Sequence, residues 1–127
     1  MNNIIKETDK NNVIGTSFYN DTINASVNEL INILHIEPFK NFDNKTKFQW
    51  CLEYYSETLN KRFYFTIYDY KEDWDSYVES DDISDDIYST KINWHKINWH
   101  IGGKCVDDTS LAKIDITNEL KEFRNKD

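Results

Sequence analysis

Residues 48–70 read FQWCLEYYSETLNKRFYFTIYDY, and this stretch decides the fold. Each half alternates large apolar side chains with polar or amphipathic ones, which is the period-two pattern of a strand with one buried face. The apolar positions are Phe48, Trp50, Leu52, Phe63, Phe65 and Ile67. Residues 56–61, between the halves, supply turn-forming residues around Asn60. The stretch therefore predicts an antiparallel hairpin whose apolar face packs under a helix.

The opposite face of this hairpin carries amphipathic rings. They are Tyr55, Tyr64, Tyr68 and Tyr70, with Trp74 and Tyr77 just beyond the second strand. Tyr and Trp are enriched in interfaces and in base-stacking sites. We therefore expect a homodimer or higher homo-oligomer that buries this face, and as the second choice a ligand pocket.

A helix is predicted over residues 26–36. Ser26 lies three residues before Glu29, as in a capping box, and the apolar residues that follow keep the spacing of one helical face. Those residues are Val27, Leu30, Ile31 and Leu34. Pro38 cannot continue a helix and is expected to end this one.

The two ends of the chain follow weaker patterns. Residues 1–12 are polar and predict a flexible N-terminal arm, and residues 13–25 predict a strand or an irregular extended segment. Residues 109–125 predict a helix capped at Asp108 or Thr109. The alternative is a short extended piece followed by a shorter helix capped by Thr117.

The pentapeptide KINWH occurs twice in tandem, at residues 91–95 and 96–100. Because five is odd, one regular strand through both copies would point equivalent side chains to opposite faces. Only one copy is therefore expected in the sheet. We expect it to be the second copy, which runs directly into Ile101, Gly102 and Gly103.

With 127 residues the chain has the length of one domain, which we assign to residues 13–127. The predicted order is extended segment, helix, hairpin, strand and helix. The economical arrangement is an α+β fold with a single small antiparallel sheet and helices packed on one face.

Charge is unevenly distributed along the chain. The 15 basic and 23 acidic residues give a net charge of −8, and residues 72–86 hold 8 acids and no base. This field disfavours nucleic acid and anionic membranes, because phosphate binding requires clustered Lys and Arg. The plain interpretation of residues 72–86 is a solvated loop. The functional one is a surface for a basic partner, presented by Asp81, Asp82, Asp85 and Asp86.

Other sequence features place the protein in the cytoplasm. Cys51 and Cys105 form neither a CxxC pair nor a disulfide framework, and the polar N-terminus lacks the apolar core of a signal peptide. No apolar run approaches the length of a membrane span. No nucleotide-cofactor motif occurs, so no cofactor is expected.

The sharpest local candidate for ligand binding is residues 99–104, WHIGGK. A glycine pair after a strand can expose backbone N–H groups to an anion, and neighbouring cations and rings can add charge and stacking. The candidate ligand-binding residues are Trp99, His100, Gly102, Gly103, Lys104, Tyr68 and Lys71. The plain alternative is a tight turn with positive φ at glycine, with Trp99 in the core.

Catalytic and metal sites have weaker support. The spacing of His95 and His100 does not match a helical metal motif, so no metal site is expected. Asp69 shows no paired carboxylate, and its plain role is a strand-end hydrogen bond. A cleaving enzyme of the phosphodiesterase type would need His100 within hydrogen-bond reach of Asp69 or Cys105.

Several blocks together resemble a pattern in small proteins of bacteriophages and large DNA viruses. The blocks are residues 15–17 (GTS), Trp50, residues 67–71 (IYDYK) and residues 99–103 (WHIGG). The family has no assigned activity, so the resemblance implies a viral accessory protein in a host cytoplasm and not a particular reaction.

Two functions from different classes follow. The first is a non-enzymatic binding protein that sequesters a phosphorylated small molecule, such as a nucleotide signal of host immunity. The second is an acidic inhibitor that blocks a basic host protein through residues 72–86.

Overall fold

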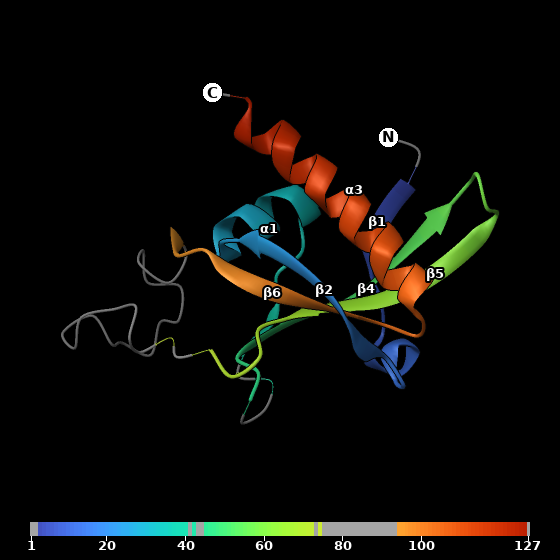
Figure 1. Ribbon diagram of the computed structural model, residues 1–127, viewed down its shortest axis with the longest axis horizontal. Helices are drawn as coiled ribbons and strands as arrows, with labels where there is room; N and C mark the ends of the chain where they lie inside the picture. Colours follow the sequence, from blue (N-terminus) through green and yellow to red (C-terminus); the bar gives the residue numbers. More distant parts are fainter. Residues whose placement is uncertain (1–2, 41, 43–44, 73, 75–93, 127) are drawn as a thin grey trace.

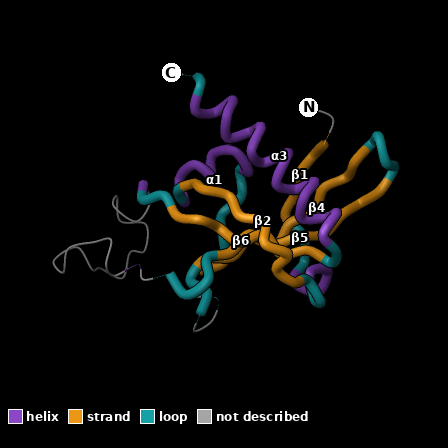
Figure 2. Tube along the Cα trace, viewed as in Figure 1, coloured by secondary structure: helices purple, strands orange, loops and turns teal. Residues whose placement is uncertain are grey.

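The computed structural model describes residues 3–40, 42, 45–72, 74 and 94–126. They form an α+β fold with one six-stranded antiparallel sheet and two helices, as predicted. Both helices lie on one side of the sheet, which we call the inner face (Figure 1). The short 3-10 helix η1 (Lys10–Val13) lies on the other side, the outer face (Figure 2).

The predicted hairpin is confirmed as the centre of the sheet. Strands β4 (Phe48–Ser56) and β5 (Lys61–Tyr68) pair antiparallel, with Trp50 opposite Ile67 and Leu52 opposite Phe65. The strand order is β1-β4-β5-β6-β2, and the two-residue β3 (Phe39–Lys40) pairs with the beginning of β4. The hairpin therefore has neighbours on both sides.

The second KINWH copy forms β6 (Ile97–Gly103), as predicted. It pairs with β5 on one side and with the edge strand β2 (Ser17–Ala25) on the other. Trp99 is fully buried on the inner face, where its indole Nε1 donates to the Ala25 carbonyl at 2.8 Å. The first copy lies largely outside the described residues.

Helix α1 (Val27–Leu34) begins at the predicted capping box. The Ser26 hydroxyl accepts from the Glu29 N–H, and the Glu29 carboxylate accepts from the Ser26 N–H, each at 3.1 Å. The helix ends at His35, whose backbone is left-handed with φ 59° and whose N–H donates to the Ile31 carbonyl. The chain therefore leaves the helix before it reaches Pro38.

Helix α3 (Val106–Arg124) packs lengthwise on the sheet (Figure 1). It begins three residues before the predicted start, with Cys105 as an N-cap that makes no side-chain cap hydrogen bond. Asp107 and Asp108 occupy the first turn, where acidic side chains are favoured by the helix dipole. Asp108 and Thr109 are helical residues and not caps, so the predicted caps and the shorter alternative helix are wrong.

The expected N-terminal arm is wrong for residues 3–7, which form the edge strand β1 (Asn3–Glu7). Backbone pairing with β4 runs from Asn3 opposite Ser56 to Glu7 opposite Leu52. Its sequence, NIIKE, places two Ile side by side and so lacks the period-two apolar signal that predicts strands. Its backbone pairing with β4 and the packing of Ile5 against the core place it in the sheet.

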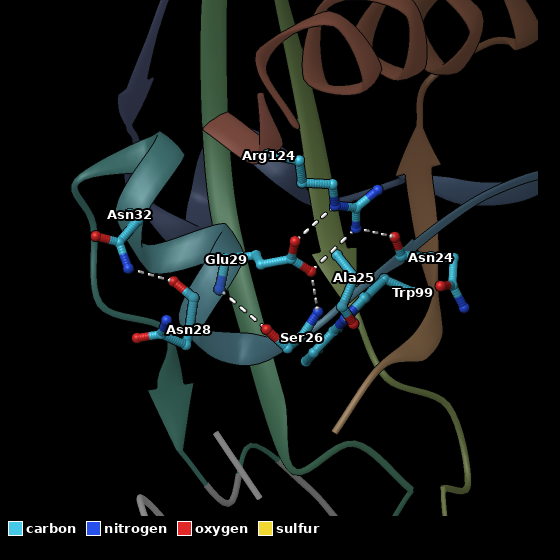
Figure 3. Close-up of polar contacts among 8 residues, drawn as sticks. All are labelled: Asn24, Ala25, Ser26, Asn28, Glu29, Asn32, Trp99 and Arg124. Atoms are coloured by element: carbon cyan, nitrogen blue, oxygen red, sulfur yellow. Dashed lines mark hydrogen bonds and ion pairs between the residues drawn. The ribbon is translucent and has the colours of Figure 1, made fainter. Parts of the chain in front are cut away.

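The inner face is filled by aromatic and aliphatic side chains. Trp50 and Trp99 meet edge to face with ring centroids 5.4 Å apart, and both are essentially unexposed. Leu30 of α1 and Ala112 and Ile116 of α3 complete this core. At its margin, Arg124 of α3 reaches Glu29 of α1 and the Asn24 carbonyl of β2 (Figure 3).

Candidate functional site

Pairing across the sheet places polar side chains in rows on the outer face. Residues directly opposite each other in antiparallel strands share a face. One row, from β4 to β2, is Gln49, Tyr68, His100 and Thr22, and the next is Cys51, Thr66, Gly102 and Phe18. Residues from separate predicted motifs are therefore direct neighbours.

A connecting segment crosses this face, because β1 and β2 lie at opposite edges of the sheet. Residues 8–16 join them through η1, which Asp9 caps by accepting from the Asn11 N–H at 2.8 Å. The backbone N–H of Thr8 donates to the Cys51 carbonyl at 3.0 Å, and the Val13 side chain is buried. The segment thus forms one wall above the outer-face rows.

Asp69 organises the opposite wall. Its carboxylate accepts from the Phe48 N–H at 2.7 Å, from the Lys47 N–H at 3.3 Å and from the Trp74 indole at 2.7 Å. The predicted strand-end hydrogen bond is therefore confirmed. Lys71, with φ 55°, donates its N–H to the Lys45 carbonyl at 2.7 Å, which joins the chain after β5 to the chain before β4.

Between these walls lies a cavity of about 260 Å³, the outer-face pocket. Its lining residues are Val13, Thr16, Ser17, Lys45, Thr46, Gln49, Thr66, Tyr68, Tyr70 and Gly102. Residues that carry hydroxyl, amide and ammonium groups therefore line a single space. Within the described part of the chain, no carboxylate belongs to this lining, although the net charge of the chain is −8.

Gly102 lines this pocket at a point where there is no room for a side chain. A Cβ atom at Gly102 would lie 2.5 Å from the Thr66 hydroxyl oxygen and 3.4 Å from the Tyr68 ring. The expected glycine turn is wrong, because Gly102 and Gly103 lie within β6 and pair with Thr66 and Phe65. Their role is close approach of neighbouring groups, and not a loop that offers backbone N–H groups to an anion.

Beside the pocket, aromatic rings enclose His100. Its imidazole stacks on Phe18 with centroids 4.1 Å apart and on Tyr70 at 5.7 Å, and Tyr68 meets it edge-on at 5.4 Å. Burial lowers the pKa of His100 and outweighs the opposing effect of Glu72 and Asp69. Burial likewise raises the pKa of Tyr68. At neutral pH this cluster is therefore uncharged.

The structure separates the predicted ligand-binding residues into two groups. In the first group, Tyr68 and Gly102 line the pocket, and His100 adjoins it through its contact with Tyr68. The Lys71 ammonium lies 5.4 Å from the ring centroid of Tyr70, which also lines the pocket. Lys104 is exposed on the same side, 5.4 Å from the Tyr64 ring.

The prediction that Trp99 and Gly103 bind a ligand is wrong. Trp99 is buried in the core on the inner face, so it offers no stacking surface to a ligand beside His100. A Cβ atom at Gly103 would lie 2.7 Å from Thr109 of α3, which also places it against the core. Because side chains alternate along a strand, consecutive residues of WHIGG lie on opposite faces of the sheet.

Trp74 is also misplaced by the sequence prediction. It was expected with the outward-facing rings, but it is 3% exposed and packs against Phe48 and Trp99. Its indole N–H is satisfied by Asp69. The candidate partner-binding residues Asp81, Asp82, Asp85 and Asp86, together with Tyr77, lie outside the described residues.

Most hydroxyl-bearing lining residues were not predicted. Thr16 and Ser17 belong to the GTS block of the resemblance, and Gln49 and Thr66 occupy the outward positions of the predicted hairpin. Lys45 and Thr46 precede β4 in a polar connection with no pattern of its own. The alternation of the hairpin, which places Gln49 and Thr66 on its outward face, is the sequence signal that could have identified these two residues.

The geometry required for the hydrolytic alternative is incomplete. Across the described residues, His100 makes no hydrogen bond with Asp69 or Cys105, and both Asp69 oxygens already accept N–H groups. Cys105 is exposed at the start of α3. Asp69 therefore acts as a structural acceptor.

Comparison with protein-family models, curated proteins and solved structures finds no match. None of the helices in the described part of the chain combines the length and the apolar character needed to span a membrane. The outer-face pocket is therefore the feature of the molecule that bears on its function.

Proposed function

We propose that this protein is a non-enzymatic binding protein that sequesters a small phosphorylated molecule in the outer-face pocket. The observation that carries the proposal is the pocket's lining. Among the described lining residues, Thr16, Thr66 and Tyr68 carry hydroxyl groups and Lys45 carries an ammonium group, and none is a carboxylate.

This chemistry suits phosphate oxygens, which accept hydrogen bonds and carry negative charge. Hydroxyls donate to such oxygens, and a Lys ammonium adds a compact positive charge. A chain of net charge −8 repels anions in general, so an anion site requires a local exclusion of acids. The described residues that line the outer-face pocket include no acid.

Size limits how much of a ligand one chain encloses. Pockets for drug-sized molecules usually measure about 300–1,000 Å³. At about 260 Å³, this cavity holds a phosphate and an adjoining group of sugar size, and not a whole dinucleotide. A larger ligand would extend along the outer face towards His100 or towards a second protomer of the expected oligomer.

The test is thermal unfolding with inorganic phosphate, ribose 5-phosphate, nucleoside 5′-monophosphates, ADP-ribose and cyclic dinucleotides. A ligand at a hundred times its Kd adds about 2.7 kcal/mol to the free energy of unfolding and raises the melting temperature. The shift should disappear in Lys45→Ala and in Thr66→Val. It should persist in Lys121→Ala, since Lys121 is an exposed residue of α3, across the sheet from the pocket.

Product analysis and light scattering complete the experiment. Recovery of the intact ligand supports sequestration, whereas its hydrolysis would favour the phosphodiesterase alternative. Light scattering on the same samples tests the expected homo-oligomer. If no phosphorylated compound stabilises the wild-type protein, the proposal fails, and the acidic segment 72–86 becomes the better candidate for function.

A further inference from the structure

Three rings on the outer face form a stacked ladder: Phe18 of β2, His100 of β6 and Tyr70 after β5. Phe18 and His100 are nearly parallel at 14°, and His100 and Tyr70 are inclined by 26°. The two end rings are 38% and 43% exposed. The ladder is therefore a surface feature, separate from the inner-face core.

Such a ladder is not explained by packing alone. The inner face already buries the residues of the hydrophobic core, and the ladder lies on the other side of the sheet. Residues held at positive φ flank both of its ends, with Asn20 at 71° two residues after Phe18 and Lys71 at 55° next to Tyr70. Asn20 lies in the register shift between Phe18 and Thr22, and Asn adopts this backbone readily. Lys71 does not adopt it readily, and strained residues of this kind concentrate at ligand sites.

Tyr70 belongs to both the ladder and the outer-face pocket. Its ring stacks on His100, and it is also one of the pocket's lining residues. Ser17, which lines the pocket, directly precedes Phe18, and Gly102 pairs with Phe18 across the strands. A phosphate among the hydroxyls would thus lie beside the Tyr70 end of the ladder.

We infer that the ligand is a nucleotide whose base stacks against the Phe18–His100–Tyr70 ladder at Tyr70 while its phosphate occupies the hydroxyl-lined pocket. This inference rests on the proposed function and names the substrate class of the same site. Flat π-faces of bases stack on aromatic side chains with little regard to base identity. The ladder therefore selects nucleotides over sugar phosphates, and the hydroxyls and Lys45 select the phosphorylated form.

The experiment compares affinities by isothermal titration calorimetry. The probes are ribose 5-phosphate and the four nucleoside 5′-monophosphates AMP, GMP, CMP and UMP. Wild-type protein should bind at least one monophosphate more tightly than ribose 5-phosphate by a factor of about five or more, the range expected for one base–aromatic stack. Tyr70→Leu should abolish the preference, because it should weaken binding of the monophosphate more than binding of ribose 5-phosphate and bring the two affinities to the same level.

Two further variants separate stacking from loss of fold. Tyr70→Phe keeps the ring and should retain the nucleotide preference. Tyr55→Leu is the matched control, because Tyr55 is 39% exposed on β4 and bonds through its hydroxyl to Asn60 at the hairpin turn. It should leave both affinities unchanged.

Each remaining outcome overturns the inference. Equal binding of ribose 5-phosphate and all four monophosphates would refute base stacking while leaving the proposed function intact. An equal loss for both ligand types in Tyr70→Leu would show that Tyr70 only shapes the pocket. Absence of binding by every phosphorylated probe would remove the proposed function and this inference with it.

Discussion

Arg124, in the last turn of α3, holds Glu29, in the first turn of α1, through a two-point contact. Its Nε atom donates to Glu29 Oε2 at 2.6 Å, and its Nη2 atom donates to Oε1 at 3.0 Å (Figure 3). Nη2 also donates to the Asn24 carbonyl at 2.9 Å. One guanidinium group thus joins the start of α1, the end of β2 and the end of α3.

Arg124→Ala should destabilise the fold by about 1–3 kcal/mol. The Glu29 side chain is 8% exposed, so removing its partner leaves a nearly buried carboxylate with only the Ser26 N–H. The penalty is below that of a fully buried pair because the Arg124 side chain is 38% exposed. Urea unfolding measures it. Arg62→Ala is the control, since the Arg62 side chain is 57% exposed and its 3.2 Å pair with Glu53 should contribute less than about 1 kcal/mol.

Acid should weaken the same contact. Hydrogen bonding from Arg124 holds the pKa of Glu29 below its ordinary value of 4.5. A folded-state pKa below the unfolded one stabilises the protein above pH 4.5, and this contribution is lost as pH falls through the folded value. Urea midpoints between pH 6 and pH 2 should therefore fall more steeply in wild type than in Glu29→Gln. Parallel curves would contradict this assignment.

Gly102→Ala should destabilise the protein by about 1–3 kcal/mol, because its Cβ would lie 2.5 Å from Thr66 Oγ1. Thr is stiff at χ1, so the hydroxyl does not move away freely. Adding Thr66→Ala removes the clashing atom and should recover most of the loss. Gly103→Ala, which meets Thr109 instead, should gain nothing from Thr66→Ala. A double-mutant cycle by urea unfolding measures the coupling.

Local patterns were sufficient to predict the centre of the fold. The alternation of residues 48–70 and the Ser26–Glu29 capping box depend on neighbours within a few positions, and the structure confirms both. β1 depends on backbone pairing with residues far along the chain, from Leu52 to Ser56. Its own residues show no period-two alternation that would predict a strand. Trp74 is buried through Asp69, five residues away, a tertiary contact that composition does not reveal.

The candidate site was only partly predictable for the same reason. Tyr68 and Gly102 were identified from local motifs, and they do line the pocket. Thr16 and Lys45 reach it from separate connections, and only the strand order brings them beside Thr66. Trp99 was assigned to the ligand because it adjoins His100 in sequence, although neighbours in a strand face opposite ways.

Asp69→Asn should destabilise the protein by about 2–3 kcal/mol. Asp69 is 1% exposed, and its two oxygens accept three N–H groups, from Lys47, Phe48 and Trp74. An amide keeps one acceptor oxygen and turns N–H donors towards the others, so at least one buried donor loses its partner.

Asp21→Asn is the matched control for this prediction. Its Oδ2 atom alone accepts from Thr109, at 2.6 Å, and from Ser110, at 3.5 Å, and an amide oxygen can replace that single acceptor. The control should lose less than about 1 kcal/mol. Urea unfolding followed by tryptophan fluorescence reports both values, since Trp74 is bound directly to Asp69. Equal losses in the two variants would mean that the three-donor arrangement does not anchor the chain after β5 to the start of β4.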